Sequence, residues 1–290
     1  MAEYKYLSPE QVDKFLEDGY IVIKNAFTKE KAAEWTKSMW TLLGIDPDDK
    51  TTWYKERIHM PWHKRELGVP LFDLLGGEDR IDEESSAWGD SFVVNLGTDA
   101  LEQAEGGRHP TDLDNWHVDG DFFVHFLDSP EQGLLVIPIL SEIQPRGGGT
   151  FICPDGLDKI AKYLSEHPEG TLRGEYDGDP HYWSHLKEIK TRSKFVEMTR
   201  QIGDVVLLHP LMMHSASKNY LRIPRVITDP PVSLKEPFNF ARESPNEYSL
   251  VERKTLKALG VERLDFKPTT ERRKIESSTR IRCLKKRKDG

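Results

Sequence analysis

The sequence predicts a mainly β fold, a sandwich or barrel, with helices flanking it. Short apolar segments recur between Ser91 and about Leu234, and turns containing Gly and Pro separate them. Many short strands divided by such turns favour antiparallel sheets over a parallel α/β sheet. The predicted strands are SFVVNL, NWHVDGDFFVHFL, GLLVIPIL, GTFICP, KFVEMT, GDVVLLHP and RVITDPPVSL.

Helices are predicted at both ends of this strand-rich region. Ser8 is suited to cap a first helix, with Pro9 at the first helical position and Gln11 completing a capping box, and Gly19 would end it. We also expect a short strand at residues 20–23 and further helices at about 28–44, 157–165 and 248–259.

The distribution of charge limits the classes of ligand. The formal net charge of the 290 residues is −8, but residues 272–290 hold nine Lys or Arg against two acidic residues, which leaves −15 on the rest. An acidic body argues against a nucleic-acid enzyme, which needs a basic face. Lys285 to Lys288 form either a nuclear address or, as the plainer interpretation, a solvated tail.

Three further features point to a reducing, cytoplasmic compartment. No apolar stretch approaches the roughly 18 residues of a membrane helix. The start of the chain lacks a basic segment followed by an apolar run, so we expect no secretory signal. Cys153 and Cys283 lie far apart in the sequence, outside any CxxC spacing, which supports neither a disulfide framework nor a zinc ribbon.

Residues 46–90 lack a clear hydrophobic period and are expected to form a functional loop or a drifted insertion. The aromatic and His residues here either line a substrate mouth or pack the loop onto the body. The cations either receive an anionic substrate or are ordinary surface charges. The first group is Trp53, Tyr54, His59, Trp62 and His63 together with Arg57, and the second is Lys55, Arg57, Lys64 and Arg65, so that Arg57 belongs to both.

The segment Trp116-His117-Val118-Asp119-Gly120 carries the candidate metal ligands. Residues two apart on a strand project from the same face, so His117 and Asp119 would present an imidazole and a carboxylate side by side. An iron(II) site with two His and one carboxylate needs one further His from a distant strand. Either His209 or His214 would serve, and their spacing of five places them on opposite faces of a regular strand.

An Arg downstream is a candidate to bind a dicarboxylate co-substrate. Arg222 and Arg225 follow the second His pair, and the planar guanidinium binds a carboxylate through two parallel hydrogen bonds. An inward Arg would be an expensive buried charge without such a partner. The alternative is that both Arg residues lie on a surface loop.

At this point the sequence resembles the phytanoyl-CoA dioxygenase-like branch of the iron(II)/2-oxoglutarate-dependent oxygenases. The matching stretches span residues 7 to about 234, and the third and fourth are the most specific. They are LSPEQVDKFLEDGYIVIKNAFTKEKAAEW, WHVDGDFF, RGGGTFICPDGLDKI and GDVVLLHPLMMHSASKN with its following Arg.

The resemblance implies a double-stranded β-helix, the cupin-like jelly roll. It assigns iron(II) to His117, Asp119 and His214, and it assigns the distal carboxylate of 2-oxoglutarate to Arg225, with Thr150 and Asn95 as further co-substrate contacts. The implied reaction uses O2 to oxidise a C–H bond of a small organic molecule, most simply by hydroxylation, and releases succinate and CO2.

On this basis residues 1–240 are expected to form one oxygenase domain, with a helical part at 8–45 and a jelly-roll core at 91–234. Residues 241–290 are expected to be an extension with one helix and a basic tail. That helix would cover the core or join two copies as a homodimer. Two departures from the family are the turn Pro154-Asp155-Gly156-Leu157 and the region after Leu234, where no family motif is found.

Two other functions stay open at this level. One is a cupin-type isomerase or hydrolase that uses the same ligands with another metal. The other is a non-catalytic module that binds metal or 2-oxoglutarate, although an intact set of His117, Asp119, His214 and Arg225 weighs against it.

Overall fold

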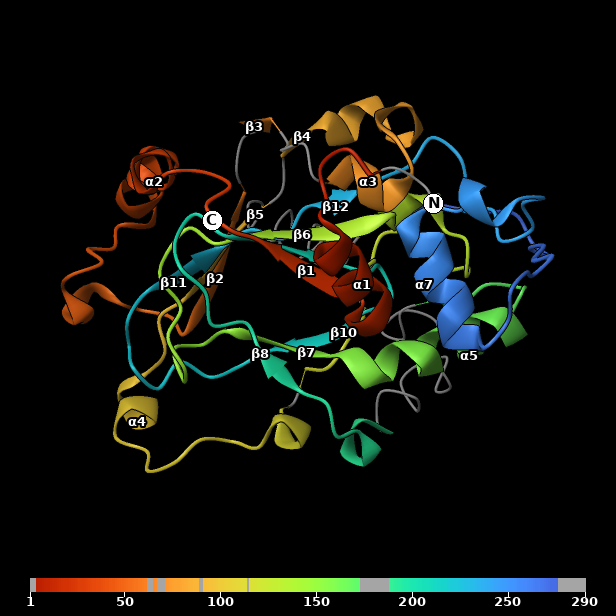
Figure 1. Cartoon of the computed structure of the whole chain (residues 1–290). Coiled ribbons are helices and arrows are strands. Elements are labelled where there is room, and N and C mark those ends of the chain that lie inside the picture. Colours follow the sequence, from red (N-terminus) through yellow and green to blue (C-terminus); the bar gives the residue numbers. More distant parts are fainter. Residues whose placement is uncertain are drawn as a thin grey trace.

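Antiparallel strands form two sheets at the centre of the computed structural model, which describes residues 4–61, 65–66, 71–88, 91–113, 115–172 and 188–275 (Figure 1). The larger sheet consists of two strand ladders, one in the order β2, β5, β11 and the other in the order β12, β6, β9, β1. A bridge between Ile139 and Ile227 joins the β6 side to the β11 side. The strands are β1 (Tyr20–Ile23), β2 (Arg57–Pro61), β5 (Ser91–Asn95), β6 (Leu134–Pro138), β9 (Val205–Leu208), β11 (Arg225–Ile227) and β12 (Pro231–Val232).

The smaller sheet carries the candidate ligands. Its order is the segment at His117, then β10 (Met213–Ala216), β7 (Thr150–Cys153) and β8 (Val196–Glu197), all antiparallel. From β5 onward the chain passes to His117, back to β6, across to β7 and β8, back to β9, across to β10 and finally to β11. Repeated crossing between two antiparallel sheets is the connectivity of a jelly roll. The predicted double-stranded β-helix is therefore confirmed.

The main helices begin and end where their capping residues predict. In α1 (Pro9–Asp18), Ser8 and Gln11 form both hydrogen bonds of the capping box, and Gly19 closes the helix in the left-handed conformation. Thr28 caps α2 (Lys29–Leu43). The other described helices are α3 (Leu71–Leu75), α4 (Asp99–Glu102), α5 (Leu157–Glu166) and α7 (Leu250–Leu259), and the small strands β3 (Arg65–Glu66) and β4 (Ala87–Trp88) pair with each other.

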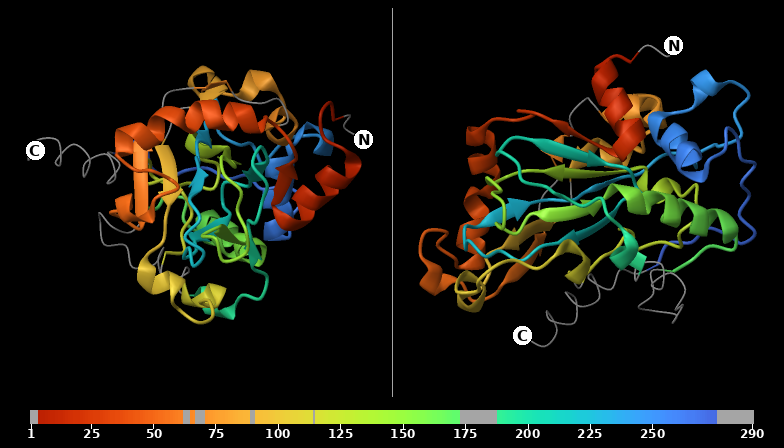
Figure 2. Two further views of the ribbon diagram at one scale, coloured as in Figure 1. Left: turned by 90° about the vertical axis from the view of Figure 1, so that its left-hand side faces the viewer. Right: turned by 60° about the horizontal axis from the view of Figure 1, so that its bottom comes forward.

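Helices close the two ends of the sheets. Helix α7 packs against α1, α3 and α5 at one end, and α2 lies at the opposite end (Figure 2, right panel). None of the helices in the described part of the chain combines the length and the apolar character needed to cross a bilayer.

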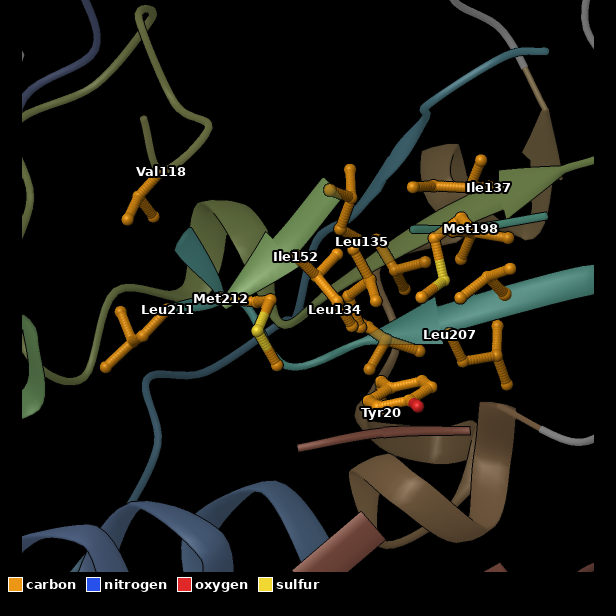
Figure 3. Close-up of a cluster of buried hydrophobic side chains, with 14 of the residues drawn as sticks. Tyr20, Val118, Leu134, Leu135, Ile137, Ile152, Met198, Leu207, Leu211 and Met212 are labelled. Atoms are coloured by element: carbon orange, nitrogen blue, oxygen red, sulfur yellow. The ribbon is translucent and has the colours of Figure 1, made fainter. Parts of the chain in front are cut away.

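Apolar side chains from both sheets fill the space between them. Leu135 and Ile137 of β6 gather with Ile152 of β7 and Met198 (Figure 3), and all four are nearly inaccessible to solvent. Burying side chains of this size stabilises the fold by about 1.5–3 kcal/mol each. The packed core supports the strands whose ends carry the polar site.

Three expectations about individual elements are wrong. Residues 115–127 do not form one strand, because Gly120 adopts φ +113° and turns the chain, which leaves only isolated bridges at residues 117, 123 and 125. The apolar stretch at residues 205–219, expected as one strand that Pro210 could interrupt, forms the two strands β9 and β10, because Pro210 follows the first and a turn from His209 to Met212 separates them. Residues 46–90 are not one loop, since they contain β2, which pairs with β5.

The chain beyond α7 returns to the jelly roll. Residues Val124 and Ile275 donate backbone hydrogen bonds to Arg273 and Phe122, so the end of the described chain runs beside the segment that follows Asp119. The side chains of Leu250, Val251 and Leu256 belong to the main core. The division at residue 240 stays a prediction, and Lys285 to Lys288 lie outside the described residues.

Candidate metal centre

Two imidazoles meet at the edge of the smaller sheet. His117 and His214 are direct cross-strand neighbours, and each backbone N–H donates to the carbonyl of the other at 2.9 Å. Their ring centroids lie 4.3 Å apart. Cross-strand neighbours project to the same face. The backbone therefore brings together side chains from two distant parts of the sequence.

Each imidazole is held by a carbonyl two residues before it. The Nδ1 of His117 lies 2.7 Å from the Asn115 carbonyl, and the Nδ1 of His214 lies 3.0 Å from the Met212 carbonyl. A carbonyl only accepts hydrogen bonds, so Nδ1 carries the hydrogen in both rings. This leaves Nε2 of both rings directed at the same space, and outer hydrogen bonds of this kind orient His ligands in metal sites.

Asp119 completes the group. Its two carboxylate oxygens lie 3.3 Å from Nε2 of His117 and 3.5 Å from Nε2 of His214. The candidate ligand atoms of the three residues all lie within 4.8 Å of one another. Burial opposes ionisation of Asp119, but the charge of His214 and hydrogen bonds from His117 and His214 hold the pKa of this carboxyl well below its usual range. The arrangement offers two nitrogen donors and one charged oxygen donor to one ion.

His209, the alternative third ligand, lies elsewhere. Its side chain is 1% exposed, its Nε2 lies 3.0 Å from Thr255 Oγ1, and its Nδ1 accepts a hydrogen bond from the Leu211 N–H. Burial, reinforced by the charge of Lys254, lowers the pKa of His209 to about 3. His209 is therefore a neutral residue that ties β9 to α7, and of the two His it is His214 that meets His117 and Asp119.

Arg225 is fully buried and incompletely paired. Its side chain is 1% exposed; Nε donates to the Gly148 carbonyl at 2.8 Å and Nη1 to the Val93 carbonyl at 3.2 Å. Its Nη2 has no hydrogen-bond partner among the described residues. Burial, with the charge of Arg57 as the next cause, lowers the pKa of Arg225 to about 10, so the group remains cationic at neutral pH. A buried cationic donor without a partner indicates a place for an anion.

Arg222, the alternative cation, faces another part of the molecule. Its guanidinium forms an ion pair with Asp99 and lies over the Trp53 ring, 5.0 Å from the centroid. The backbone of Arg222 is left-handed, at φ +48°, which breaks the alternation between the two Arg residues. Only Arg225 therefore lies on a strand that faces the second sheet.

The two further predicted co-substrate contacts differ in their surroundings. Asn95 is 0% exposed; its side-chain amide donates to the Ser217 carbonyl at 3.0 Å and accepts from the Gly97 N–H at 3.3 Å. These bonds join the two sheets, so its polar atoms are already used. Thr150 is buried at the start of β7, opposite Ala216. The contribution of both residues to co-substrate binding stays a prediction.

Gly148 is a site residue that sequence reasoning treated only as part of a turn. It has φ +80°, and a Cβ there would lie 2.6 Å from Nδ2 of Asn95, while its carbonyl receives the Arg225 hydrogen bond. The run Gly147-Gly148-Gly149 was the available signal, because Gly allows the close approach of backbone to a polar side chain. Of the aromatic and basic residues predicted around residues 46–90, Trp62, His63 and Lys64 and the side chain of Arg65 lie outside the described residues.

Comparison with known proteins adds an independent result. No family model matches the chain. Over 274 residues it is 24% identical to the ectoine dioxygenase of Sphingopyxis alaskensis, a match that covers 89% of this chain and 87% of that protein. The resemblance predicted from the motifs is confirmed. The match extends beyond the jelly-roll core, which accounts for residues 91–234 only.

Solved structures also resemble the chain. EctD from S. alaskensis with bound Fe gives a TM-score of 0.45 at 19% identity, over 90% of this chain and 86% of that one. The non-heme alpha ketoglutarate dependent carbocyclase SnoK from nogalamycin biosynthesis gives 0.46 at 14% identity, over 79% and 84% of the two chains. HygX from Streptomyces hygroscopicus, with nickel and 2-oxoglutarate bound, gives 0.41 at 16% identity, over 82% and 91%.

Proposed function

We propose that this chain is an iron(II)- and 2-oxoglutarate-dependent oxygenase that oxidises a C–H bond of a small organic molecule. The observation that carries the proposal is the convergence of His117, Asp119 and His214 within 4.8 Å, together with the unpartnered Nη2 of buried Arg225. The similarity to ectoine dioxygenase supports the same reaction class.

The three proposed ligands fit iron(II). Two neutral imidazoles and one carboxylate on one side of an ion are the donor set of non-haem iron(II) oxygenases, and they leave other positions open. The carbonyls of Asn115 and Met212 hold the two rings with Nε2 toward the metal position. The low pKa of Asp119 keeps the third donor charged.

Arg225 distinguishes this function from a cupin-type hydrolase or isomerase. Such an enzyme needs the metal ligands, and it would need a buried cation with a free donor only if its own substrate were an anion. A dicarboxylate co-substrate supplies the missing partner, because one end can bind the metal while the other accepts hydrogen bonds from Nη2. Charge-assisted hydrogen bonds of this kind are about twice as strong as neutral ones.

When bound, iron(II) and 2-oxoglutarate supply the oxidising chemistry: the co-substrate is oxidised to succinate and CO2 as O2 is reduced, with one oxygen atom entering succinate and the other the substrate C–H bond. His117, Asp119 and His214 orient the reacting centre. Arg225 holds the co-substrate at its far end. The apolar side chains between the sheets exclude water from the region behind the site.

The first experiment is an anaerobic titration of the purified protein with iron(II) and 2-oxoglutarate. The chelate gives a weak visible charge-transfer band, which should appear in the wild-type protein and be absent from Asp119→Ala. Asp112→Ala, an exposed acidic residue in the preceding turn, is the matched control and should keep the band. No band in the folded wild-type protein, or a full band and wild-type succinate production in Asp119→Ala, would refute the proposal.

We extend the proposal to the setting of the enzyme. The substrate is a small molecule, and the enzyme acts in the cytoplasm without binding nucleic acid or membranes. A homodimer formed through the C-terminal region is the assembly to test, by light scattering at several protein concentrations. Thr150 and Asn95 are the proposed secondary contacts to the co-substrate, of which Thr150 has the more available side chain.

A further inference from the structure

Strand β2 places two basic side chains on the same face of the sheet as Arg225. Arg57 lies opposite Asn95, and Asn95 lies opposite Arg225. His59 lies opposite Val93. Residues directly opposite one another in an antiparallel sheet project to the same side. Arg57 and His59 therefore share a face with Asn95 and Arg225.

This shared face is directed at the second sheet. The side chain of Asn95 reaches the Ser217 carbonyl, just past β10, and the side chain of Arg225 reaches the Gly148 carbonyl, just before β7. Arg57 and His59 consequently lie on the face that is turned toward the second sheet, but on the outermost strand of the larger sheet, where His59 is exposed to solvent and Arg57 is partly exposed. The metal position lies across the space between the two sheets, on the same β10 edge.

Neither side chain is committed to a strong partner. Among the residues that the structure describes, Arg57 forms one ion pair, with its chain neighbour Glu56 at a long 3.8 Å, and Glu56 already binds Lys218 at 2.9 Å. The Arg57 side chain is 28% exposed, so it reaches both the solvent and the interior. Within the part of the chain that the structure describes, the His59 side chain forms no hydrogen bond or ion pair.

The electrostatics agree with this placement. Partial loss of hydration is the main cause that lowers the pKa of His59, followed by the charges of Arg225 and Arg57, while Asp119 acts in the opposite direction. The same Arg57 charge lowers the pKa of Arg225. The positive charge of Arg57 therefore acts on Arg225, and the negative charge of the candidate ligand Asp119 acts on His59.

An unbalanced charge remains after the co-substrate is accounted for. One carboxylate of 2-oxoglutarate satisfies Arg225, which leaves Arg57 as a cation directed at the site. Partial loss of hydration lowers the pKa of His59, so at pH 7 Arg57 is the cationic side chain that β2 presents on this face. A single planar guanidinium matches a carboxylate monoanion, whereas a phosphate dianion needs more charge.

We propose that Arg57, with His59 beside it, binds a carboxylate of the substrate, so that the enzyme oxidises a small organic acid; this inference rests on the proposed oxygenase function. Arg57 fixes one end of the substrate on β2. The C–H bond that is oxidised is then the one that lies beside the metal position when the carboxylate is bound to Arg57. Arg57 acts as a specificity-determining residue.

The test compares acids with their primary amides, which differ in charge but little in shape. The probes are 3-phenylpropionate with 3-phenylpropionamide, and N-acetylglycine with N-acetylglycinamide. Two readouts are used: the perturbation of the anaerobic chelate band, and ligand-observed NMR binding to the metal-free protein. The proteins are the wild type, Arg57→Gln, Arg225→Gln and the control Arg146→Gln, which removes an exposed cation outside the site.

In the wild type and in Arg146→Gln, the acids should bind about 10- to 100-fold more tightly than the amides, since hydrogen bonds to charged groups contribute on this scale. Arg57→Gln should abolish that preference while keeping the chelate band. The proposal is overturned if no acid outperforms its amide, if Arg57→Gln keeps the preference, or if only Arg225→Gln removes it. Loss of the chelate band in Arg57→Gln would also overturn it, because Arg57 would then bind the co-substrate.

The two readouts separate this inference from the oxygenase function. If the wild type lacks the chelate band but NMR still shows an acid preference that needs Arg57, the carboxylate site stands and the oxygenase function falls. If the band is present without an acid preference, the reverse holds. Circular dichroism and thermal unfolding confirm that each variant is folded.

Discussion

Replacing Arg225 with Gln should raise the 2-oxoglutarate concentration needed for half-maximal turnover by about 10- to 150-fold. The structure leaves Nη2 of Arg225 free for one charge-assisted hydrogen bond, and such a bond contributes about 1.5–3 kcal/mol. A tenfold change in affinity corresponds to about 1.4 kcal/mol. The maximal rate at saturating co-substrate should change much less, because Arg225 holds the end remote from the reacting atoms.

The assay is succinate formation as a function of 2-oxoglutarate, with anaerobic titration of the chelate band as a direct measure of binding. Arg225→Lys keeps the charge without the planar fork and should recover part of the affinity. Arg222→Gln is the control, since that guanidinium is paired with Asp99 over Trp53. If Arg222→Gln weakens co-substrate binding and Arg225→Gln does not, the assignment of the anion site is wrong.

Three further predictions address stability and the metal position. Burial lowers the pKa of His209 to about 3, so below about pH 6.5 the unfolded chain takes up a proton that the folded chain does not. The free energy of unfolding should therefore fall as the pH drops below that value. Urea titrations at several pH values should show a flatter decline for His209→Gln than for the wild type. Glu252→Gln should destabilise the fold by about 3–5 kcal/mol at pH 7, measured by urea unfolding, because Glu252 is buried and pairs with two Arg residues; a change below about 1 kcal/mol would contradict this. Gly120→Ala should bind less iron per folded protein molecule, as measured by metal analysis, because a Cβ at φ +113° would lie 2.6 Å from the Phe123 ring. Unchanged iron content would show that this turn does not position Asp119.

Local chemistry made the helices and most strands predictable. Helix α1 is determined by four residues that each favour one position at a helix end, without any tertiary contact. They are Ser8, Pro9, Gln11 and Gly19. The apolar runs at β6 and β9 likewise predict strands, because a strand that is buried on both faces consists of consecutive apolar residues. In these places local propensity and the final packing agree.

The polar site was predictable in its residue types but not in its geometry. Strand periodicity alone could not choose between His209 and His214, which only the family resemblance separated, because the choice depends on where Pro210 ends β9 and where β10 begins. It could not choose between Arg222 and Arg225 either, because the left-handed backbone at Arg222 resets the alternation of side chains. Such choices are made by backbone irregularities that depend on long-range contacts.

Strand β2 was missed for a related reason. Arg57 to Pro61 has two basic residues and a Pro in five positions, a composition poor for a strand. It becomes a strand because the edge of β5 offers it hydrogen-bonding partners. Charged residues and Pro are common on edge strands, where they discourage pairing with other chains. Here the same charges face a site.

The pairing of His117 with His214 sets the order of events when the protein is made. A chain still emerging from the ribosome holds two of the three proposed ligands long before the third is synthesised. Pairing over such a sequence separation is slow to form, because closing a long loop costs entropy before any contact is gained. The complete set of proposed ligands therefore exists only after this long-range pairing has formed, and the backbone that forms it also orients both imidazoles.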